Sequence, residues 1–157
     1  MKKISILLLL IIPSFIFAQN YGIGVIIGSP TGFTGKYFLA RTSAIQINAG
    51  WSFVSDVKFH ITGDYQFLFP GVIKGEEGVA LRNVVPYFGI GGSFRAKTAE
   101  PPDETDETDF CIGLRLGGGI EYLISRFGVF LELYPVVNVI PSTDLHVEGG
   151  LGFRFYF

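Results

Sequence analysis

Apolar and polar residues alternate strictly along the last part of the chain. From Leu145 to Phe157 the odd positions are apolar or glycine, and the even positions are polar residues or glycine. A period of two places the two sets on opposite faces of an extended strand. We therefore expect a final strand over residues 145–157, with one apolar face and one polar face.

The same alternation continues through the preceding chain and divides it into eight segments. Polar or glycine-rich stretches separate the segments, and their composition is typical of turns and loops. The expected strands are 21–28, 33–39, 45–53, 57–69, 84–95, 112–122, 127–134 and 145–157. The expected connections are 28–32, 40–42, 54–56, 70–83, 96–109, 125–126 and 136–143. Eight consecutive strands of this kind predict an all-β, antiparallel up-and-down barrel.

Residues 1–18 have a different character. Two lysines precede an apolar run over residues 4–17, which is the pattern of a secretory signal peptide. A membrane anchor is the alternative, but the run is short for a bilayer span of ~20 residues and Pro13 would interrupt its helix. We expect export, removal of residues 1–18 and a barrel domain over residues 19–157.

Composition indicates which face of the barrel points outward. The chain is 48% hydrophobic and 15% aromatic, and only 17% of its residues are charged, against about 25% in soluble domains. A secreted lipocalin-like barrel would bury the apolar face and present the polar face to water. Here the polar face is dominated by glycine with single charges between, which suits the narrow lumen of an eight-stranded barrel. We therefore expect the apolar face, with aromatic residues near the strand ends, to contact lipid.

Net charge and cysteine content exclude some classes of function. A formal charge of −2 provides no basic surface for nucleic acid. Cys111 is the only cysteine, so no internal disulfide can form, and we expect it to face the packed interior. No phosphate loop, zinc spacing or haem motif is present, and we expect no cofactor.

Three motifs, taken with the eight segments, resemble a known family. Residues 28–32 read Gly-Ser-Pro-Thr-Gly, residues 141–144 read Pro-Ser-Thr-Asp, and residues 152–157 read Gly-Phe-Arg-Phe-Tyr-Phe. Over residues 20–157 the chain resembles the small eight-stranded outer-membrane barrels of the OmpA and OmpX type, and more narrowly a bacterial family of OmpA-like barrels of unassigned function. The resemblance implies an outer-membrane location and no activity. No peptidoglycan-binding domain follows the barrel, so cell-wall tethering is not implied.

The aromatic residues of the final strand are part of this resemblance. Phe153, Phe155 and Phe157 resemble the signal by which outer-membrane barrels are recognised for assembly. This implies two partners, the barrel assembly machinery and outer-membrane lipid.

Charged residues on the polar face are the candidate functional residues. Arg115, Glu132 and Glu148 have similar expected depths on consecutive strands, which predicts an ion pair between Arg115 and one of the two carboxylates. A charge in a narrow lumen is tolerable when it is paired, so we expect a network that plugs the barrel. The alternatives are a gated ion path and a catalytic carboxylate pair. The network residues are Lys36, Asp64, Arg115, Glu121, Glu132, Glu148 and Arg154, with Lys58 and Arg95 on the same face.

The two histidines suggest an enzyme as an alternative. His146 lies close in sequence to Ser142, Asp144 and Glu148, and His60 is the second histidine. A lipid-modifying enzyme would need a nucleophile, a base and an acid within hydrogen-bond reach. No signature of such enzymes is present, and we expect lumen-facing histidines without catalytic function.

The connection over residues 96–109 carries six carboxylates. Such a density could hold Ca²⁺, but the spacing lacks the EF-hand pattern. We expect a solvated acidic loop on the outside of the cell, available to an extracellular ligand or a host protein. The sequence thus favours a non-enzymatic outer-membrane scaffold that displays surface loops. A narrow ion channel and a lipid-modifying enzyme are the alternatives.

Overall fold

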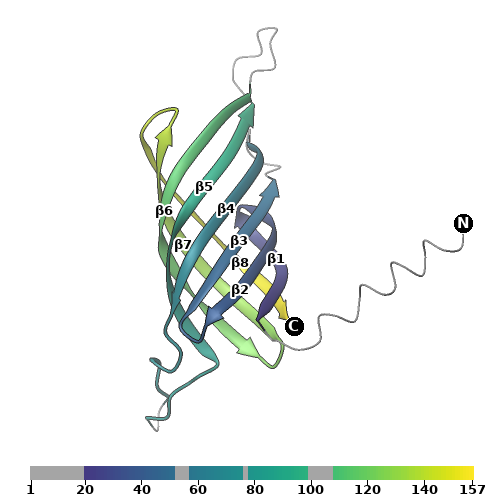
Figure 1. Cartoon of the computed structure of the whole chain (residues 1–157), viewed down its shortest axis with the longest axis vertical. Helices are drawn as coiled ribbons and strands as arrows, with labels where there is room; N and C mark the ends of the chain where they lie inside the picture. Colours follow the sequence, from purple (N-terminus) through teal and green to yellow (C-terminus); the bar gives the residue numbers. More distant parts are fainter. Residues whose placement is uncertain (1–19, 52–56, 76–77, 99–107) are drawn as a thin grey trace, which may run out of the picture.

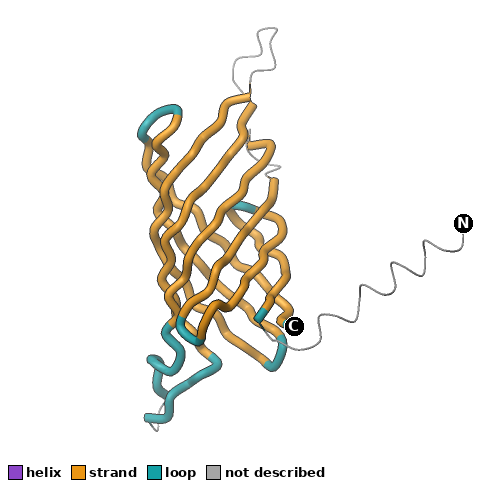
Figure 2. Tube along the Cα trace, in the orientation of Figure 1, coloured by secondary structure: helices purple, strands orange, loops and turns teal. Residues whose placement is uncertain are grey.

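The computed structural model describes residues 20–51, 57–75, 78–98 and 108–157. In these residues the chain forms eight antiparallel strands that close into one barrel in sequence order (Figures 1 and 2). They are β1 (Tyr21–Ser29), β2 (Thr31–Ala40), β3 (Ser43–Trp51), β4 (Val57–Leu68), β5 (Val84–Thr98), β6 (Thr108–Ile124), β7 (Phe127–Ile140) and β8 (Asp144–Tyr156). The predicted fold class is confirmed. The predicted signal peptide lies outside the described residues.

The two faces of the barrel wall follow the alternation of the sequence. In β7, Glu132 and Tyr134 are buried in the lumen, whereas Leu131 and Leu133, which alternate with them, are 57% and 62% exposed. The same inside-outside alternation continues in β8, where Arg154 is buried and Phe153 is exposed. The apolar face therefore points outward, which excludes the arrangement of a lipocalin-like barrel.

The antiparallel order places the connections alternately at the two ends of the barrel. The C-terminus and the connections β2–β3, β4–β5 and β6–β7 share one end, called here the lower end as it is drawn in Figure 1. The connections β1–β2, β3–β4, β5–β6 and β7–β8 belong to the upper end. Within the parts of the chain that the structure describes, no helix is long and apolar enough to cross a membrane.

Strand β7 is longer than the sequence pattern predicts. The expected connection 136–143 is wrong, because β7 continues to Ile140 and only residues 141–143 separate it from β8. Pro135 lies inside the strand, where it pairs with Val147 of β8, while the pairing of β6 with β7 omits Tyr134 and Pro135. A proline cannot donate to a ladder, and the gap on the β6 side accommodates its missing N–H.

The expected connection 96–109 is also too wide. Strand β5 extends to Thr98 and β6 begins at Thr108, so that Thr98 pairs with Thr108. Because the stretch is acidic, its whole sequence resembles a loop, although residues 96–98 belong to β5 and residues 108–109 belong to β6. Residues 99–107, which hold five of the six carboxylates, lie outside the described residues, so a Ca²⁺ site there stays a prediction.

The first hairpin is tighter than expected. Strand β1 reaches Ser29 and β2 begins at Thr31, so the expected turn 28–32 is largely strand. The hydroxyl of Thr31 accepts a hydrogen bond from the Gly28 N–H at 3.0 Å and donates to the Gly28 carbonyl at 2.9 Å. Gly28 has a φ of 151°, which favours glycine at this position. The third strand begins two residues earlier than expected, at Ser43, and its expected end at residue 53 lies outside the described residues, whereas β4 ends one residue early.

Glycines on the inner face make room for large polar side chains of neighbouring strands. A Cβ at Gly91 would lie 2.4 Å from Oδ1 of Asp64, and one at Gly128 would lie 2.7 Å from Oε1 of Glu121. The high glycine content of the polar face is therefore complementary to its large residues, because the lumen of an eight-stranded barrel is only wide enough for side chains to fill.

Apolar side chains close the lumen at its lower end. Ala44, Leu68 and Val85 lie at the lower ends of β3, β4 and β5, and they form a buried cluster with Tyr87. The partly buried Phe38 and Leu123 pack against this cluster. The lumen is thus polar along most of its length and apolar near its lower end.

Candidate functional site

The buried polar network of the lumen is the candidate functional site, and its lower part is built around Glu121. Lys36 donates from Nζ to Oε2 of Glu121 at 2.7 Å, and Nη1 of Arg154 lies 3.4 Å from Oε1. The hydroxyl of Tyr156 donates to the same Oε1. Arg154 also donates to the hydroxyl of Thr34, from Nε at 3.1 Å and from Nη2 at 2.8 Å. Two cations, one carboxylate and two hydroxyls therefore fill this level.

Glu132 connects the lower part of the network to the upper part. Its carboxylate accepts hydrogen bonds from Gln46 Nε2 at 2.7 Å, Tyr87 Oη at 3.0 Å and Asn48 Nδ2 at 3.3 Å. Arg154 donates from Nη2 to the carbonyl oxygen of Gln46. The amide of Gln46 thus links Arg154, in the lower part of the network, to Glu132.

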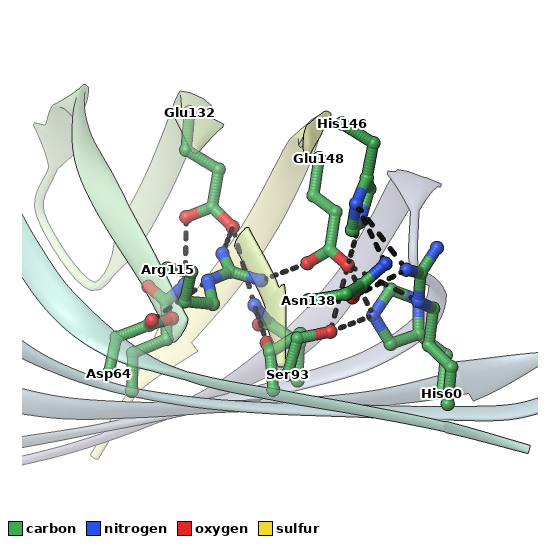
Figure 3. A network of polar contacts seen from close by, with 12 residues as sticks. His60, Asp64, Ser93, Arg115, Glu132, Asn138, His146 and Glu148 are labelled. Atoms are coloured by element: carbon green, nitrogen blue, oxygen red, sulfur yellow. Dashed lines mark hydrogen bonds and ion pairs between the residues drawn. The ribbon is translucent and has the colours of Figure 1, made fainter. Parts of the chain in front are cut away.

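Arg115 is the centre of the upper part and contacts three carboxylates (Figure 3). Its Nη1 donates to Oε2 of Glu148 at 2.8 Å, its Nε lies 2.9 Å from Oδ1 of Asp64, and its Nη2 lies 3.8 Å from Oε1 of Glu132. These partners come from β4, β7 and β8. The guanidinium spans the lumen and is 1% exposed.

Glu148 has further partners towards the upper end (Figure 3). Its Oε1 accepts a hydrogen bond from Ser93 Oγ at 2.8 Å, and Nε2 of His60 and Nε2 of His146 each lie 3.1 Å away. Arg95 approaches the same oxygen with Nε at 3.8 Å. This carboxylate thus has polar partners on β4, β5, β6 and β8.

Three buried cations lie over aromatic rings, which adds a cation–π contact to each ion pair. The pairs, with distances to the ring centroid, are Arg154 over Phe130 at 3.6 Å, Arg115 over Tyr134 at 4.1 Å and Lys36 over Tyr87 at 4.8 Å. Alternating rings and charges leave each level of the lumen occupied by side chains.

The sequence places the seven network residues on the polar face, and the structure brings all seven into contact with one another or with shared partners. Sequence reasoning missed the neutral members that join the charges, above all Gln46, Asn48 and Ser93. These three residues are polar and occupy inward-facing positions of the alternating pattern, and this combination could have identified them as members of the network. The seven residues and these three together form one continuous network through the described lumen.

The histidines do not adopt the geometry of a hydrolase site. Nε2 of His60 faces both Ser93 Oγ at 3.0 Å and Glu148 Oε1 at 3.1 Å. A catalytic triad instead uses one ring nitrogen for the nucleophile and the other for the acid. Asp144, named with His146 as an alternative, is exposed at the upper end. Among the described residues, no group of three or more His, Cys, Asp or Glu side chains is placed to hold a metal ion.

Comparison with solved structures identifies the fold. The crystal structure of the N-terminal β-barrel domain of Pseudomonas aeruginosa OprF superimposes with a TM-score of 0.66 at 19% sequence identity. The match covers 88% of this chain and 98% of the OprF domain. The chain has the fold of a small OmpA-like barrel.

This OmpA-like barrel fold is the one that the sequence motifs predicted. No protein-family model and no curated protein sequence matches the chain. At this level of identity the likeness concerns the fold, so the function must be argued from the surface and the lumen of this chain.

Proposed function

We propose that the chain is an outer-membrane β-barrel with a sealed lumen, which acts as a non-enzymatic scaffold for its surface loops. The observation that carries this proposal is the continuous network of buried charges from Lys36 to His146. A barrel filled in this way leaves its upper connections as the part accessible to partners. Candidate partners are an extracellular ligand or a host protein.

The outer surface supports the membrane location. Ile27, Leu114 and Val147 point away from the lumen and are 71%, 66% and 58% exposed. Soluble monomers rarely expose contiguous apolar patches larger than a few hundred Å², whereas an outward apolar band is what a transmembrane barrel presents to lipid. Strands can cross a membrane only when their hydrogen bonds are closed into a barrel, and these are.

Two features of the lumen support a sealed barrel. Arg115 and Arg154 are at most 1% exposed, and displacing Arg115 would leave the buried Asp64 without its partner, at a cost of about 3–5 kcal/mol. The apolar cluster around Leu68 and Val85 adds a second barrier, because an ion would lose its hydration there.

One observation favours a narrow ion channel as the second candidate. Asn48 Oδ1, Gln66 Oε1 and Tyr134 Oη are buried without a hydrogen-bond partner among the described residues. Buried polar atoms of this kind are sites where water is accommodated. Water in the middle of the lumen would form part of a path for ions. The charge network and the apolar cluster would still block this path on either side.

Electrical recording separates the two candidates. The refolded chain is inserted into a planar lipid bilayer, and we expect no unitary conductance steps above the background of the bilayer. As a positive control, Lys36→Ala, Glu121→Ala and Leu68→Ala together remove one ion pair and part of the apolar cluster, and we expect this variant to admit ions through the lower lumen. Discrete, reproducible steps from the native chain that change in Arg115→Lys would establish the channel instead.

A lipid assay tests the non-enzymatic part of the proposal. The native chain is incubated with phospholipid and with lipid A, and the products are measured by mass spectrometry. We expect no change in acyl composition. Deacylated or acylated products that disappear in His60→Ala would contradict the scaffold proposal.

A further inference from the structure

The lower end of the barrel carries exposed cations on each of its three connections. Arg41 lies in the β2–β3 turn, Lys74 and Arg82 lie in the β4–β5 connection, and Arg126 lies in the β6–β7 turn. No acidic side chain is present in the described residues of these connections; Glu76 and Glu77 lie outside the described residues. In the described residues the three lower connections therefore carry four exposed cations, and Glu76 and Glu77 of the β4–β5 connection reduce the net positive charge of this end.

The two ends of the barrel differ in charge. The sequence between β5 and β6 contains a run of carboxylates, and Asp144 at the start of β8 is exposed at the upper end. Cations placed only to keep the protein soluble would not be expected to gather at one end. With Glu76 and Glu77 counted, the lower connections still hold more cations than carboxylates, whereas the stretch between β5 and β6 is strongly acidic. A net positive end is complementary to a surface of negative charge.

Aromatic side chains lie beside these cations on the outer wall. Near the lower end, the rings of Tyr21 and Tyr37 are 4.7 Å apart, and those of Phe127 and Phe155 are 5.2 Å apart. Arg126 directly precedes Phe127. An aromatic girdle marks the depth of the lipid headgroups in transmembrane barrels, so Arg126 lies close to that depth.

The β4–β5 connection adds apolar side chains to the same end. In its described residues, Leu81 N donates to the Ile73 carbonyl at 2.8 Å and Gly75 N donates to the Val79 carbonyl at 2.9 Å. Val72 and Val79 are 65% and 63% exposed. Apolar side chains near Lys74 suit the boundary between headgroups and acyl chains.

We propose that Arg41, Lys74, Arg82 and Arg126 form a collar that binds the phosphate groups of anionic phospholipid. The proposal rests on the proposed function, since it requires the barrel to be inserted in a bilayer. The collar then contacts the leaflet on the side of the lower connections, and it gives the barrel a preference for anionic over zwitterionic headgroups. The exposed apolar residues of the β4–β5 connection lie in the same interface.

Lipid selectivity tests the collar. The chain is refolded into phosphatidylcholine vesicles that contain trace spin-labelled phosphatidylglycerol or spin-labelled phosphatidylcholine, and the motionally restricted fraction of each label is measured by electron paramagnetic resonance. We expect the protein-associated fraction to give an association constant about fivefold higher for phosphatidylglycerol, because each cation near an anionic surface contributes roughly a factor of five. High salt should reduce this ratio.

Charge variants locate the effect. Replacing the four cations by glutamine should bring the ratio close to one, and Arg41→Gln with Arg126→Gln should give an intermediate value if the fourfold variant folds poorly. The matched control is Lys97→Gln, near the upper end of β5, which should leave the ratio unchanged.

Each alternative outcome is distinguishable. A chain that is folded and restricts both labels equally, or whose selectivity survives the fourfold replacement, would overturn the collar and leave the barrel proposal standing. Loss of selectivity in Lys97→Gln would place the lipid site at the wrong end. A chain that restricts neither label is not in the bilayer, which would overturn both proposals.

Discussion

The guanidinium of Arg115 donates to the carboxylate of Glu148 at 2.8 Å across the lumen, and both residues are 1% exposed. The same guanidinium lies 2.9 Å from Asp64, so its removal leaves Asp64 without an ion-pair partner among the described residues and leaves Glu148 with only the more distant Arg95 as a permanent cation. We predict that Arg115→Leu lowers the free energy of unfolding by about 3–5 kcal/mol, as for other broken buried ion pairs. Urea unfolding of the chain in lipid vesicles measures this value.

A charge-conserving variant separates the loss of charge from the loss of shape. Arg115→Lys keeps a cation near the two carboxylates and should cost less than Arg115→Leu, because only the forked donor geometry is lost. Equal stability of all three chains would mean that Arg115 is not paired in the lumen.

Gly91 provides a test of the packing between wall and lumen. A Cβ at this position would lie 2.0 Å from the Gly63 carbonyl oxygen and 2.4 Å from Oδ1 of Asp64. We predict that Gly91→Ala lowers the free energy of unfolding by about 1–3 kcal/mol, the range typical of overpacked interiors. Gly63→Ala is the matched control, since a Cβ at Gly63 would meet no atom of the described residues within 4 Å. A cost at Gly63 equal to that at Gly91 would argue against this lumen packing.

Much of this architecture follows from the alternation alone. A strand has a side-chain period of two, so the apolar or polar character of each position fixes the face on which Arg115, Glu132 and Glu148 lie. Strand ends are less predictable, because they depend on pairing with a neighbour. Pro135 resembles the start of a turn in sequence, yet it continues β7 since the pairing with β8 persists beyond it.

The predicted ion pair of Arg115 with Glu132 or Glu148 is confirmed by the contact with Glu148, but most other partners across the barrel were beyond the reach of the sequence. Lys36 and Glu121 are 85 positions apart, and their contact depends on how the closed barrel staggers its strands. The apolar cluster at Leu68 and Val85 was missed for a related reason. These residues have the inward parity of the polar face, and only the closed barrel brings them together near one end.

The terminal residue should matter for assembly and little for the finished barrel. Phe157 is 44% exposed, its N–H donates to the Tyr21 carbonyl at 2.8 Å, and its ring packs at 4.9 Å from Phe155. We predict that deletion of Phe157 lowers the amount of folded protein in the outer membrane of cells, because the terminal aromatic residue is the expected assembly signal. Unchanged amounts in membrane fractions would contradict this function of Phe157, and refolded protein should have nearly native stability in either case.

The order of the strands predicts which connections face outward. With both termini of the barrel in the periplasm, the connection within residues 96–109 lies outside the cell, and the connection over 70–83 lies inside. We predict that protease added to intact cells cleaves a site engineered into 96–109 and spares one engineered into 70–83. The reverse pattern would show that the topology is inverted.

The central claim is that this chain is a closed barrel inserted in a membrane, and heat-modifiability tests it most directly. A transmembrane barrel keeps its hydrogen-bonded wall in detergent until it is heated, so folded and unfolded forms migrate differently in gel electrophoresis. Unboiled and boiled samples of the chain, extracted with detergent from the membrane fraction, are compared on the same gel. We predict a clear difference in migration between them. A chain that is soluble without detergent and migrates identically before and after boiling would contradict the account.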